Sequence, residues 1–388
     1  MPSPKPPVDK SPAATPTGDP WLLTPGPLTT SPSVKEAMLH DYGSRDGHFI
    51  AINRRLRERL LDIIGNRQDF VCVPLQGSGT FSVEAMLGNF VPQDGKLLIL
   101  INGAYGKRMA KICDYYGRAT VIQETAEDVP VDPEALDKAL TADASITHVA
   151  VVHCETTSGI LNPVEEVAAV AADAGRALIV DAMSTFGALA LDATKVPYAA
   201  IIASSNKCLE GAPGIGFAVI EKTALEAAKG NAPFLSLDLH DQWRGFAANG
   251  QWRFTPPTHV LAAFGKAIEL HAAEGGIAGR GGRYRNNCKV LVAGMRALGF
   301  ETFLPDDLQA PIIVTFRNPA DAKFDFQKFY DGLGARGCII YPGKLTRDAS
   351  FRIGCIGALD EGDMRRVLDA VPEVLKELGV RDCAPARN

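Results

Sequence analysis

The chain has 388 residues, a formal net charge of −5 and 46% hydrophobic residues, which is typical of a soluble globular protein. The acidic balance argues against a nucleic-acid-binding protein, and no apolar run approaches the roughly 20 residues of a membrane span. The length exceeds what one hydrophobic core normally serves, so we expect two domains.

Both ends of the chain and the cysteines favour a cytoplasmic protein with loose termini. Residues 1–19 are rich in Pro, Ser and Thr and are expected to form a disordered tail, because they bury too little apolar surface to offset ordering entropy. We expect residues 382–388 to be loose as well. The N-terminus lacks an export pattern, and the eight cysteines form no CxxC pair, so we expect reduced thiols rather than disulfides or a zinc site.

Between these ends, short apolar segments alternate with helical patterns. Strands are expected at 70–74, 97–101, 119–122, 148–153, 177–180, 199–203 and 215–220. Helical patterns follow at 81–90, 105–117, 132–142 and 163–175. Short apolar strands joined by helices are typical of parallel sheets buried on both faces. Residues 20–275 are therefore predicted to form a large α/β domain with a mainly parallel sheet.

A smaller α+β domain is expected over residues 276–381. A long helical pattern at 258–276 leads into it. Its own helices are expected at 285–299, at 324–337 and at the end, with strands at 311–316, 338–343 and 350–355.

Four polar segments follow strands of the expected large sheet. They are GSGT at 77–80, HCETTSG at 153–159, DAMSTFG at 181–187 and SSNKC at 204–208. In open α/β sheets, ligands bind at the carboxyl ends of the strands. One pocket is therefore expected to gather a glycine loop, hydroxyl groups, a carboxylate and a lysine.

This set of groups matches what pyridoxal 5′-phosphate (PLP) chemistry needs. A lysine amine, Lys207, must bond to the cofactor aldehyde, and a carboxylate, Asp181, must keep the pyridine nitrogen protonated. Helix N-terminal amides and hydroxyls, here Ser78, Gly79 and Thr80, must hold the phosphate. Each feature alone has a simpler interpretation as a surface lysine, a helix-capping aspartate or an ordinary glycine turn. Their combination favours the cofactor.

The motifs around these residues resemble class V aminotransferases of fold type I, over about residues 21–375. They are SSNKCLEGAPGIGF around Lys207, ALIVDAMSTFG around Asp181, HCETTSGILNP and LLTPGPLTTS. The segments TPGPLTTSPSVKEAML, DYGSRDGHF and IYPGK are similar to the branch of that family that acts on 2-aminoethylphosphonate and pyruvate. The resemblance implies PLP as cofactor, phosphonoacetaldehyde and alanine as products, and a homodimer.

The same resemblance implies a role for individual residues. Lys207 resembles the Schiff-base lysine, Asp181 the ring-nitrogen partner, and Ser78, Gly79 and Thr80 the phosphate cradle. Further matches are Asn206 before the lysine, Tyr105 as the stacking aromatic, Thr156 as a hydroxyl near the ring, Thr255 as a contact to the neighbouring subunit's phosphate, and Arg352 as the clamp for the substrate carboxylate.

The choice of substrate leaves alternatives open. A buried phosphonate dianion needs more than one positive group or a cluster of main-chain amides, and Arg45 in GSRDGHF or Lys344 in YPGK is a candidate for the second positive group. Arg45 has a purely structural alternative, a pair with Asp46 or with a neighbouring subunit. The rival functions are an alanine–glyoxylate or serine–glyoxylate aminotransferase, which shares the cofactor motifs, and a non-catalytic α/β binding protein.

Overall fold

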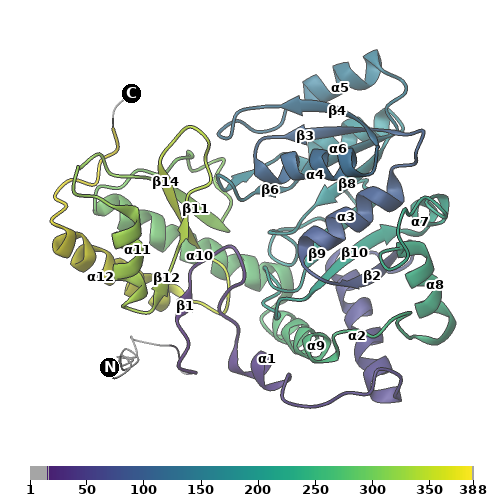
Figure 1. Cartoon of the computed structure of the whole chain (residues 1–388), viewed down its shortest axis with the longest axis horizontal. Coiled ribbons are helices and arrows are strands. Elements are labelled where there is room, and N and C mark those ends of the chain that lie inside the picture. The colour runs from purple at the N-terminus through teal and green to yellow at the C-terminus, as the bar shows by residue number, and fades with distance from the viewer. Residues whose placement is uncertain (1–14, 16, 387–388) are drawn as a thin grey trace, which may run out of the picture.

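The computed structural model describes residue 15 and residues 17–386, so most of the tail expected at 1–19 lies outside the described residues. The described chain forms two units, which Figure 1 shows side by side. A large sheet covered by helices lies on the right, and a smaller unit built from the C-terminal third of the chain lies on the left.

The large unit is built on a seven-stranded sheet of order β2-β10-β9-β8-β5-β3-β4. Its strands are β2 (Phe70–Gln76), β3 (Lys96–Ile101), β4 (Ala119–Glu124), β5 (His148–Val152), β8 (Ala177–Asp181), β9 (Ala200–Ser204) and β10 (Ile215–Glu221). β10 runs antiparallel to both of its neighbours, and the other neighbouring pairs are parallel. The prediction of a mainly parallel sheet is therefore confirmed.

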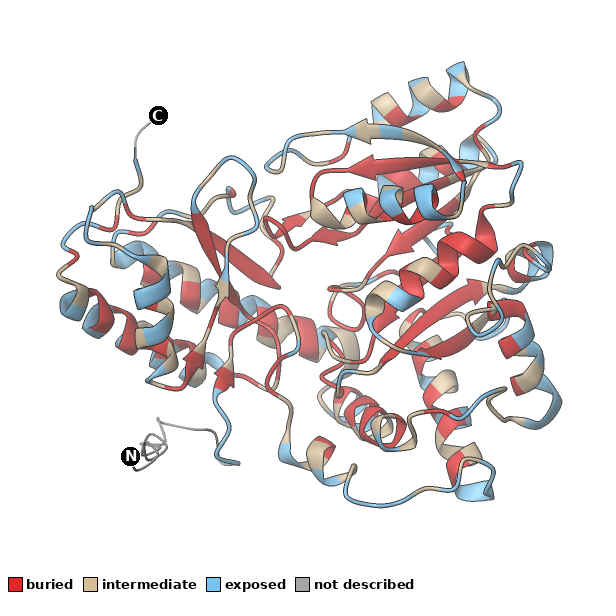
Figure 2. Ribbon diagram, viewed as in Figure 1, coloured by how far each residue is buried: buried red, intermediate tan, exposed pale blue. Residues whose placement is uncertain are grey.

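Helices cover both faces of this sheet, and its strands other than the edge strand β4 are buried along most of their length (Figure 2). One face packs against α2 (Gly47–Ile63), α5 (Pro133–Ala142), α6 (Val164–Asp173) and α9 (Thr258–Ala273). The other packs against α3 (Gly79–Phe90), α4 (Ala104–Tyr115), α7 (Lys222–Ala227) and α8 (Leu239–Asn249). A short helix, α1 (Pro32–Glu36), precedes α2.

The C-terminal unit combines three helices with a small antiparallel sheet of order β11-β14-β13. The strands are β11 (Ile313–Arg317), β13 (Tyr341–Pro342) and β14 (Ser350–Gly354), and the helices are α10 (Gly276–Ala297), α11 (Phe326–Gly334) and α12 (Glu361–Leu378). α10 begins well before the helix expected at 285–299. The glycines in its first turns disfavour a helix locally, so tertiary packing forms this part.

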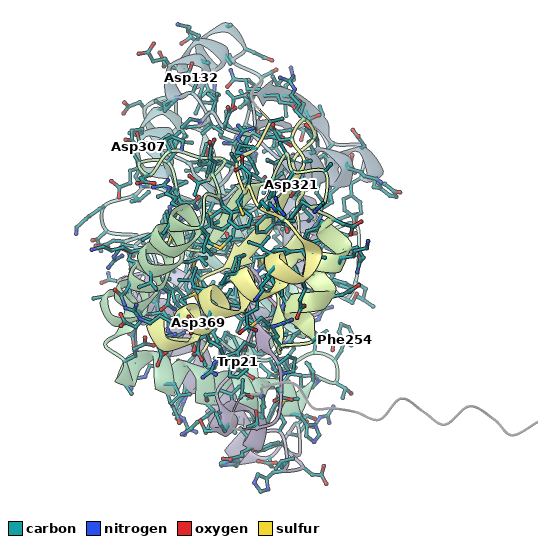
Figure 3. All side chains as sticks on the ribbon, turned by 90° about the vertical axis from the view of Figure 1, so that its left-hand side faces the viewer. Trp21, Asp132, Phe254, Asp307, Asp321 and Asp369 are labelled. Atoms are coloured by element: carbon teal, nitrogen blue, oxygen red, sulfur yellow. The ribbon has the colours of Figure 1, made fainter. Side chains whose placement is uncertain are left out.

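The start of the large domain and one strand of the C-terminal unit differ from expectation, because residues distant in sequence pair with each other. β1 (Trp21–Leu22) pairs in parallel with β12 (Cys338–Ile339), and Trp21 and Leu23 are buried in the C-terminal core. Figure 3 shows Trp21 beside α12, where the guanidinium of Arg366 lies 4.4 Å from the ring centroid. Residues 21–23 thus belong to the C-terminal unit rather than to the expected domain over 20–275. The strand expected at 338–343 is likewise split between two sheets.

Some of the residues expected to be loose are anchored. Asp19 forms an ion pair with Lys35. Near the other end, Cys383 is buried in the C-terminal core, and Ala384 accepts a backbone hydrogen bond from Ala320 (2.8 Å). The expectation that the chain is loose from Asp382 onward is therefore wrong for residues 382–384.

Within the described part of the chain, no helix is long and apolar enough to cross a membrane.

Candidate active site

A cavity of about 510 Å³ lies at the carboxyl ends of β8 and β9, beside the start of α3. It brings together most of the residues that the sequence predicts for a cofactor site: Ser78, Gly79, Thr80, Tyr105, Asp181, Asn206 and Lys207. A smaller adjoining cavity of about 20 Å³ adds Thr156. Because β8 and β9 are parallel neighbours, their carboxyl ends bring Asp181 and the Lys207 loop to the same edge of the sheet.

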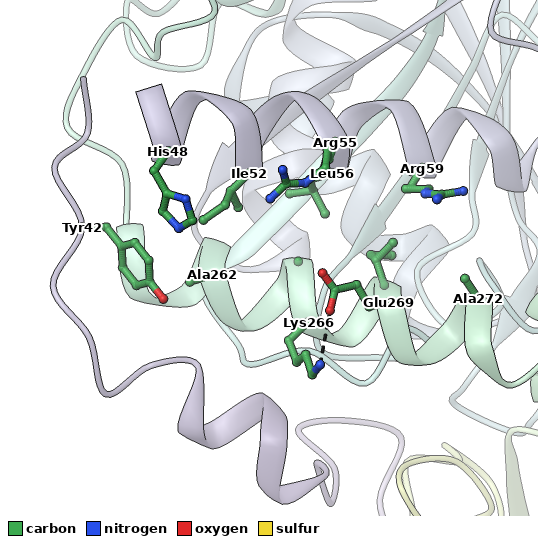
Figure 4. Close-up of a pocket in the computed structure, with 12 residues that line it drawn as sticks. Tyr42, His48, Ile52, Arg55, Leu56, Arg59, Ala262, Lys266, Glu269 and Ala272 are labelled. Carbon is green, nitrogen blue, oxygen red and sulfur yellow. Dashed lines mark hydrogen bonds and ion pairs between the residues drawn. The ribbon is translucent and has the colours of Figure 1, made fainter. Parts of the chain in front are cut away.

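A second hollow, of about 410 Å³, lies between α2 and α9 and is lined by none of these residues (Figure 4). Charged side chains line it, including Arg55, Arg59 and an ion pair between Lys266 and Glu269 (3.3 Å). It contains no nucleophile next to a base and no cradle for a phosphate. The chemistry expected from the sequence therefore belongs to the first cavity.

Lys207 is held in this cavity by the N-terminal segment. Its Nζ donates a hydrogen bond to the carbonyl of Gly26 (3.0 Å), and burial lowers the pKa of the amine. A Cβ atom on Gly26 would lie 2.9 Å from that Nζ, and Gly26 has φ +105, so only glycine suits this position. The sequence alone does not distinguish Gly26, because its contact with Lys207 joins residues that lie far apart in the chain.

Asp181 is a buried carboxylate, only 4% exposed, at the end of β8. Its Oδ1 accepts a hydrogen bond from the amide of Met183 (2.9 Å), and burial raises the pKa of the side chain to about 6. No described lysine or arginine forms an ion pair with it. A buried carboxylate with so little compensation fits a cationic ligand group such as a protonated pyridine nitrogen.

The start of α3 has the features of a phosphate site. Ser78 is the N-cap but makes no capping hydrogen bond with its side chain, which leaves the first amides of the helix available to an anion. Arg108 on α4 lines the same cavity and donates to Oγ1 of Thr80 (3.1 Å). Its guanidinium carbon lies 4.9 Å from the ring centroid of Tyr105. Arg108 is not among the residues predicted from the sequence. Its position three residues after Tyr105 on the same helix indicates that the two side chains share a face, and this was the signal that could have found it.

Tyr105 is positioned by a buried carboxylate at the start of α4. Oε2 of Glu155 accepts hydrogen bonds from the amides of Tyr105 (3.0 Å) and Gly106 (3.4 Å), and Oε1 accepts from the hydroxyl of Thr157 (2.6 Å). Burial raises the pKa of Glu155. Glu155 lies between Cys154 and Thr156 in a hairpin formed by β6 (Cys154–Glu155) and β7 (Ile160–Leu161).

Two cations of the C-terminal unit approach Tyr105 and Thr156. Nζ of Lys344 lies 3.4 Å from the hydroxyl of Tyr105. Burial alone would raise the pKa of Tyr105, but a hydrogen bond with Thr156 and the charges of Lys344 and Lys207 lower it overall. Arg352 on β14 is buried and donates from Nη1 to the carbonyl of Thr156 (2.7 Å) and from Nε to that of Pro342 (2.9 Å). Two of the three nitrogens of its guanidinium group thus already donate to main-chain oxygens.

Thr255 and Arg45, the two remaining predicted residues, do not line the cavity of their own chain. Thr255 is exposed in the loop before α9, and Arg45 is exposed just before α2. Arg45 forms no ion pair with Asp46, whose carboxylate instead caps α2 by accepting from the amide of Phe49 (2.9 Å). The roles expected for Thr255 and Arg45 therefore stay predictions.

Comparison with known proteins places the chain among aminotransferases. The sequence profile of class-V aminotransferases matches residues 35–335. A 2-aminoethylphosphonate–pyruvate transaminase of Cupriavidus necator is 54% identical over 367 residues, which cover 95% of this chain and 97% of the relative. A protein of the same name from Pseudomonas putida (strain W619) is 55% identical over 363 residues, covering 94% of this chain and 99% of the relative.

Solved structures share the fold at lower sequence identity. Pyridoxamine–pyruvate aminotransferase from Mesorhizobium loti has a TM-score of 0.86 at 24% identity, with 95% of each chain covered. Alanine–glyoxylate aminotransferase from Nostoc sp. has a TM-score of 0.85 at 22% identity, covering 94% of this chain and 97% of the other. The fold is that of the type I PLP-dependent aminotransferases, and the chain belongs to the class-V aminotransferase family.

Proposed function

We propose that this protein is a PLP-dependent transaminase that moves the amino group of 2-aminoethylphosphonate to pyruvate, giving phosphonoacetaldehyde and alanine. The observation that carries the proposal is one cavity that joins a buried amine, a buried carboxylate and the free start of a helix, with two cations beside it. The names of relatives that are 54% and 55% identical over nearly the whole chain support the same substrates.

The residues of the cavity fit PLP at each of its ends. The start of α3, Thr80 and Arg108 would hold the phosphate, Tyr105 would cover a ring face, and Lys207 would bond to the aldehyde. When bound, PLP supplies an electron sink that makes the carbon bearing the amino group acidic. Asp181 would keep the ring nitrogen protonated, and that cation would in turn offset the cost of burying the carboxylate.

Lys207 is the group that moves the proton. With PLP bound, the free amine of Lys207 would take the proton from the substrate carbon that bears the amino group and would hold it for return within the same cavity. Burial lowers the pKa of this amine, which favours the neutral form that can accept a proton. Its contact with Gly26 shows how the N-terminal segment limits where the amine can lie.

Arg352 and Lys344 would bind the acidic ends of the two substrates. Arg352 serves the single carboxylate of pyruvate and alanine, and Lys344 adds the second positive charge that a phosphonate dianion needs. Both cations come from the C-terminal unit, on or beside β14. Because Arg45 is exposed and outside the cavity, Lys344 is now the better supported candidate for the phosphonate within one chain.

An amino-donor panel tests the proposed function. The purified protein should show the visible absorbance of lysine-bound PLP and should form alanine and phosphonoacetaldehyde in equal amounts from 2-aminoethylphosphonate and pyruvate. Absence of the absorbance would favour a non-catalytic binding protein. Faster turnover of alanine or serine with glyoxylate would favour the glyoxylate-directed alternative and reject the phosphonate substrate.

We also propose a cytoplasmic homodimer. Phe81, next to the phosphate cradle, and Phe254, next to Thr255, are 49% and 40% exposed, and a second copy would cover such apolar side chains. All eight cysteines are free, which suits a reducing compartment. Light scattering that finds an active monomer would reject the dimer. A Thr255→Ala chain whose PLP affinity equals that of the wild type would reject the contact of Thr255 with the neighbouring subunit's phosphate.

A further inference from the structure

Helix α10 has a buried face that is polar rather than apolar. Arg280, Arg283, Tyr284 and Asn287 recur at helical spacing on this face, here called the α10 polar face, and Arg280 and Tyr284 are 1% and 0% exposed. A helix that packs against a core normally presents apolar side chains at this spacing. Figure 1 shows α10 reaching from the C-terminal unit toward the large unit, so this face lies where the two units meet.

One end of the α10 polar face holds the loop that carries Lys207. Oε1 of Glu210 accepts from Nη2 of Arg283 (2.7 Å) and from the hydroxyl of Tyr284 (2.6 Å), and Arg280 donates to the carbonyl of Cys208 (2.5 Å). Glu210 has φ +58, a left-handed conformation that costs free energy for a residue with a side chain. These contacts therefore hold the Lys207 loop in a strained turn.

The other end holds the segment that follows the Arg352 strand. Nη1 of Arg283 donates to the carbonyls of Gly357 (2.5 Å) and Leu359 (2.7 Å). Nδ2 of Asn287 donates to the carbonyls of Cys355 (3.1 Å) and Leu359 (3.0 Å). Because β14 ends at Gly354, the guanidinium group of Arg283 contacts both the segment just beyond the strand that carries Arg352 and, through Glu210, the loop that carries Lys207.

The charges in this network balance, which explains how they can be buried. Glu274 accepts from Nε of Arg280 (2.6 Å) and from Nε of Arg283 (2.7 Å), so two arginines meet Glu210 and Glu274. None of these two arginines and two glutamates lines the cavity. A satisfied network of buried charged groups is rigid, so a displacement at one end of the network is passed to the groups held at its other end.

We propose that Glu210 and Arg283 are positioning residues that couple anion binding at Arg352 to the position of the Lys207 amine. The inference rests on the proposed function, because it concerns Lys207 as the PLP-binding lysine. A carboxylate bound by Arg352 fixes β14 and the segment 355–359, Arg283 transmits that position, and Glu210 passes it to the loop three residues after Lys207. By linkage, the state of Lys207 then alters anion affinity at Arg352.

The test uses the holoenzyme and acetate, a carboxylate that lacks an amino group. The midpoint of the pH titration of the PLP absorbance is measured with and without saturating acetate. The variants are Glu210→Gln, which keeps shape but loses charge, and Arg283→Lys, which keeps charge but loses the fork. Arg296→Lys is the matched control, since Arg296 lies on the same helix in an exposed pair with Asp306 (2.6 Å).

Acetate should shift the midpoint in the wild type and in Arg296→Lys. Glu210→Gln and Arg283→Lys should lose about half of that shift or more, and their turnover should be about tenfold lower than that of the wild type. Tyr105, Cys208, Asp181 and Lys344 also act on Lys207, and none of these four groups is changed in any of the proteins compared. If both variants misfold, Tyr284→Phe removes one hydroxyl and should lose part of the shift.

The outcomes separate the two proposals. A folded variant that keeps the whole acetate shift and normal turnover overturns the coupling while leaving the proposed function intact. A wild type without the PLP absorbance refutes the proposed function, and the coupling with it. A wild type that absorbs, turns over and binds acetate without any shift of the midpoint also overturns the coupling.

Discussion

Asp181→Asn should stabilise the PLP-free protein while it impairs catalysis. Burial raises the pKa of Asp181 from 3.8 to about 6, with the nearby Glu155 acting in the same direction. Between these two pH values the folded protein holds a proton that the unfolded chain has released, so stability falls as the pH rises through this window. Above about pH 6 the folded protein carries an ionised, buried carboxylate, and asparagine avoids that cost.

The gain in stability of the variant over the wild type follows from the size of the pKa shift of Asp181. A shift of about two units raises the free energy of unfolding by about 3 kcal/mol at pH 7.5, and about half of this gain should remain at pH 5. With about 2 cal/mol/K of unfolding entropy per residue, the melting temperature of a chain of this size should rise by about 4 °C. Asparagine keeps an oxygen that can accept from the amide of Met183, so the local hydrogen bond survives.

Thermal unfolding of the PLP-free wild type and variant between pH 5 and pH 7.5 checks this reasoning. Asp369→Asn, an exposed substitution on α12, should change stability little at either pH. With PLP bound, the order should reverse, because only the wild type pairs its carboxylate with the ring nitrogen. An Asp181→Asn protein without PLP that is no more stable than the wild type at pH 7.5, or a difference independent of pH, would refute the argument.

Three further substitutions test the site and the fold. Lys207→Ala should abolish turnover and the visible absorbance of bound PLP, and normal transamination by this variant would reject the lysine. Lys344→Gln should raise KM for 2-aminoethylphosphonate by about tenfold or more and KM for alanine far less in steady-state kinetics; equal changes would place Lys344 outside substrate recognition. Lys107→Gln is the control, since Lys107 is an exposed lysine that pairs with Glu124 (2.8 Å) and does not line the cavity. Trp21→Ala should destabilise the protein by about 3–5 kcal/mol in chemical denaturation, and a small effect would contradict its place in the C-terminal core.

The large sheet was predictable because its signals are local. Each central strand is a short apolar run, such as Leu97–Ile101 in the printed sequence, and burial on both faces selects such runs whatever their partners. The same logic predicted Asp181 and Lys207. Polar residues directly after apolar strands must leave the core at the sheet's edge, and parallel neighbours leave it at the same edge.

Features that depend on contacts between distant segments were not predictable in this way. Arg108 and Gly26 have no unusual local context, and only the fold reveals that one lies at the phosphate cradle and the other against Lys207. The start of α10 is rich in glycine, so local propensity opposes the helix that packing forms. Its buried polar face also resembles a solvated face in the sequence, because periodicity reports which residues share a face and not what that face meets.

Contacts between the two units explain why the candidate active site cannot be assigned to one unit alone. Residues 21–23 pair with and pack in the C-terminal unit, and Gly26, a few residues later, contacts the Lys207 amine in the large unit. Lys344 and Arg352 approach the same cavity from the C-terminal unit. The surroundings of Lys207 are therefore complete only when both units are folded and in contact. Loss of the Trp21 contact should weaken PLP binding as well as stability, although Trp21 itself lies outside the cavity.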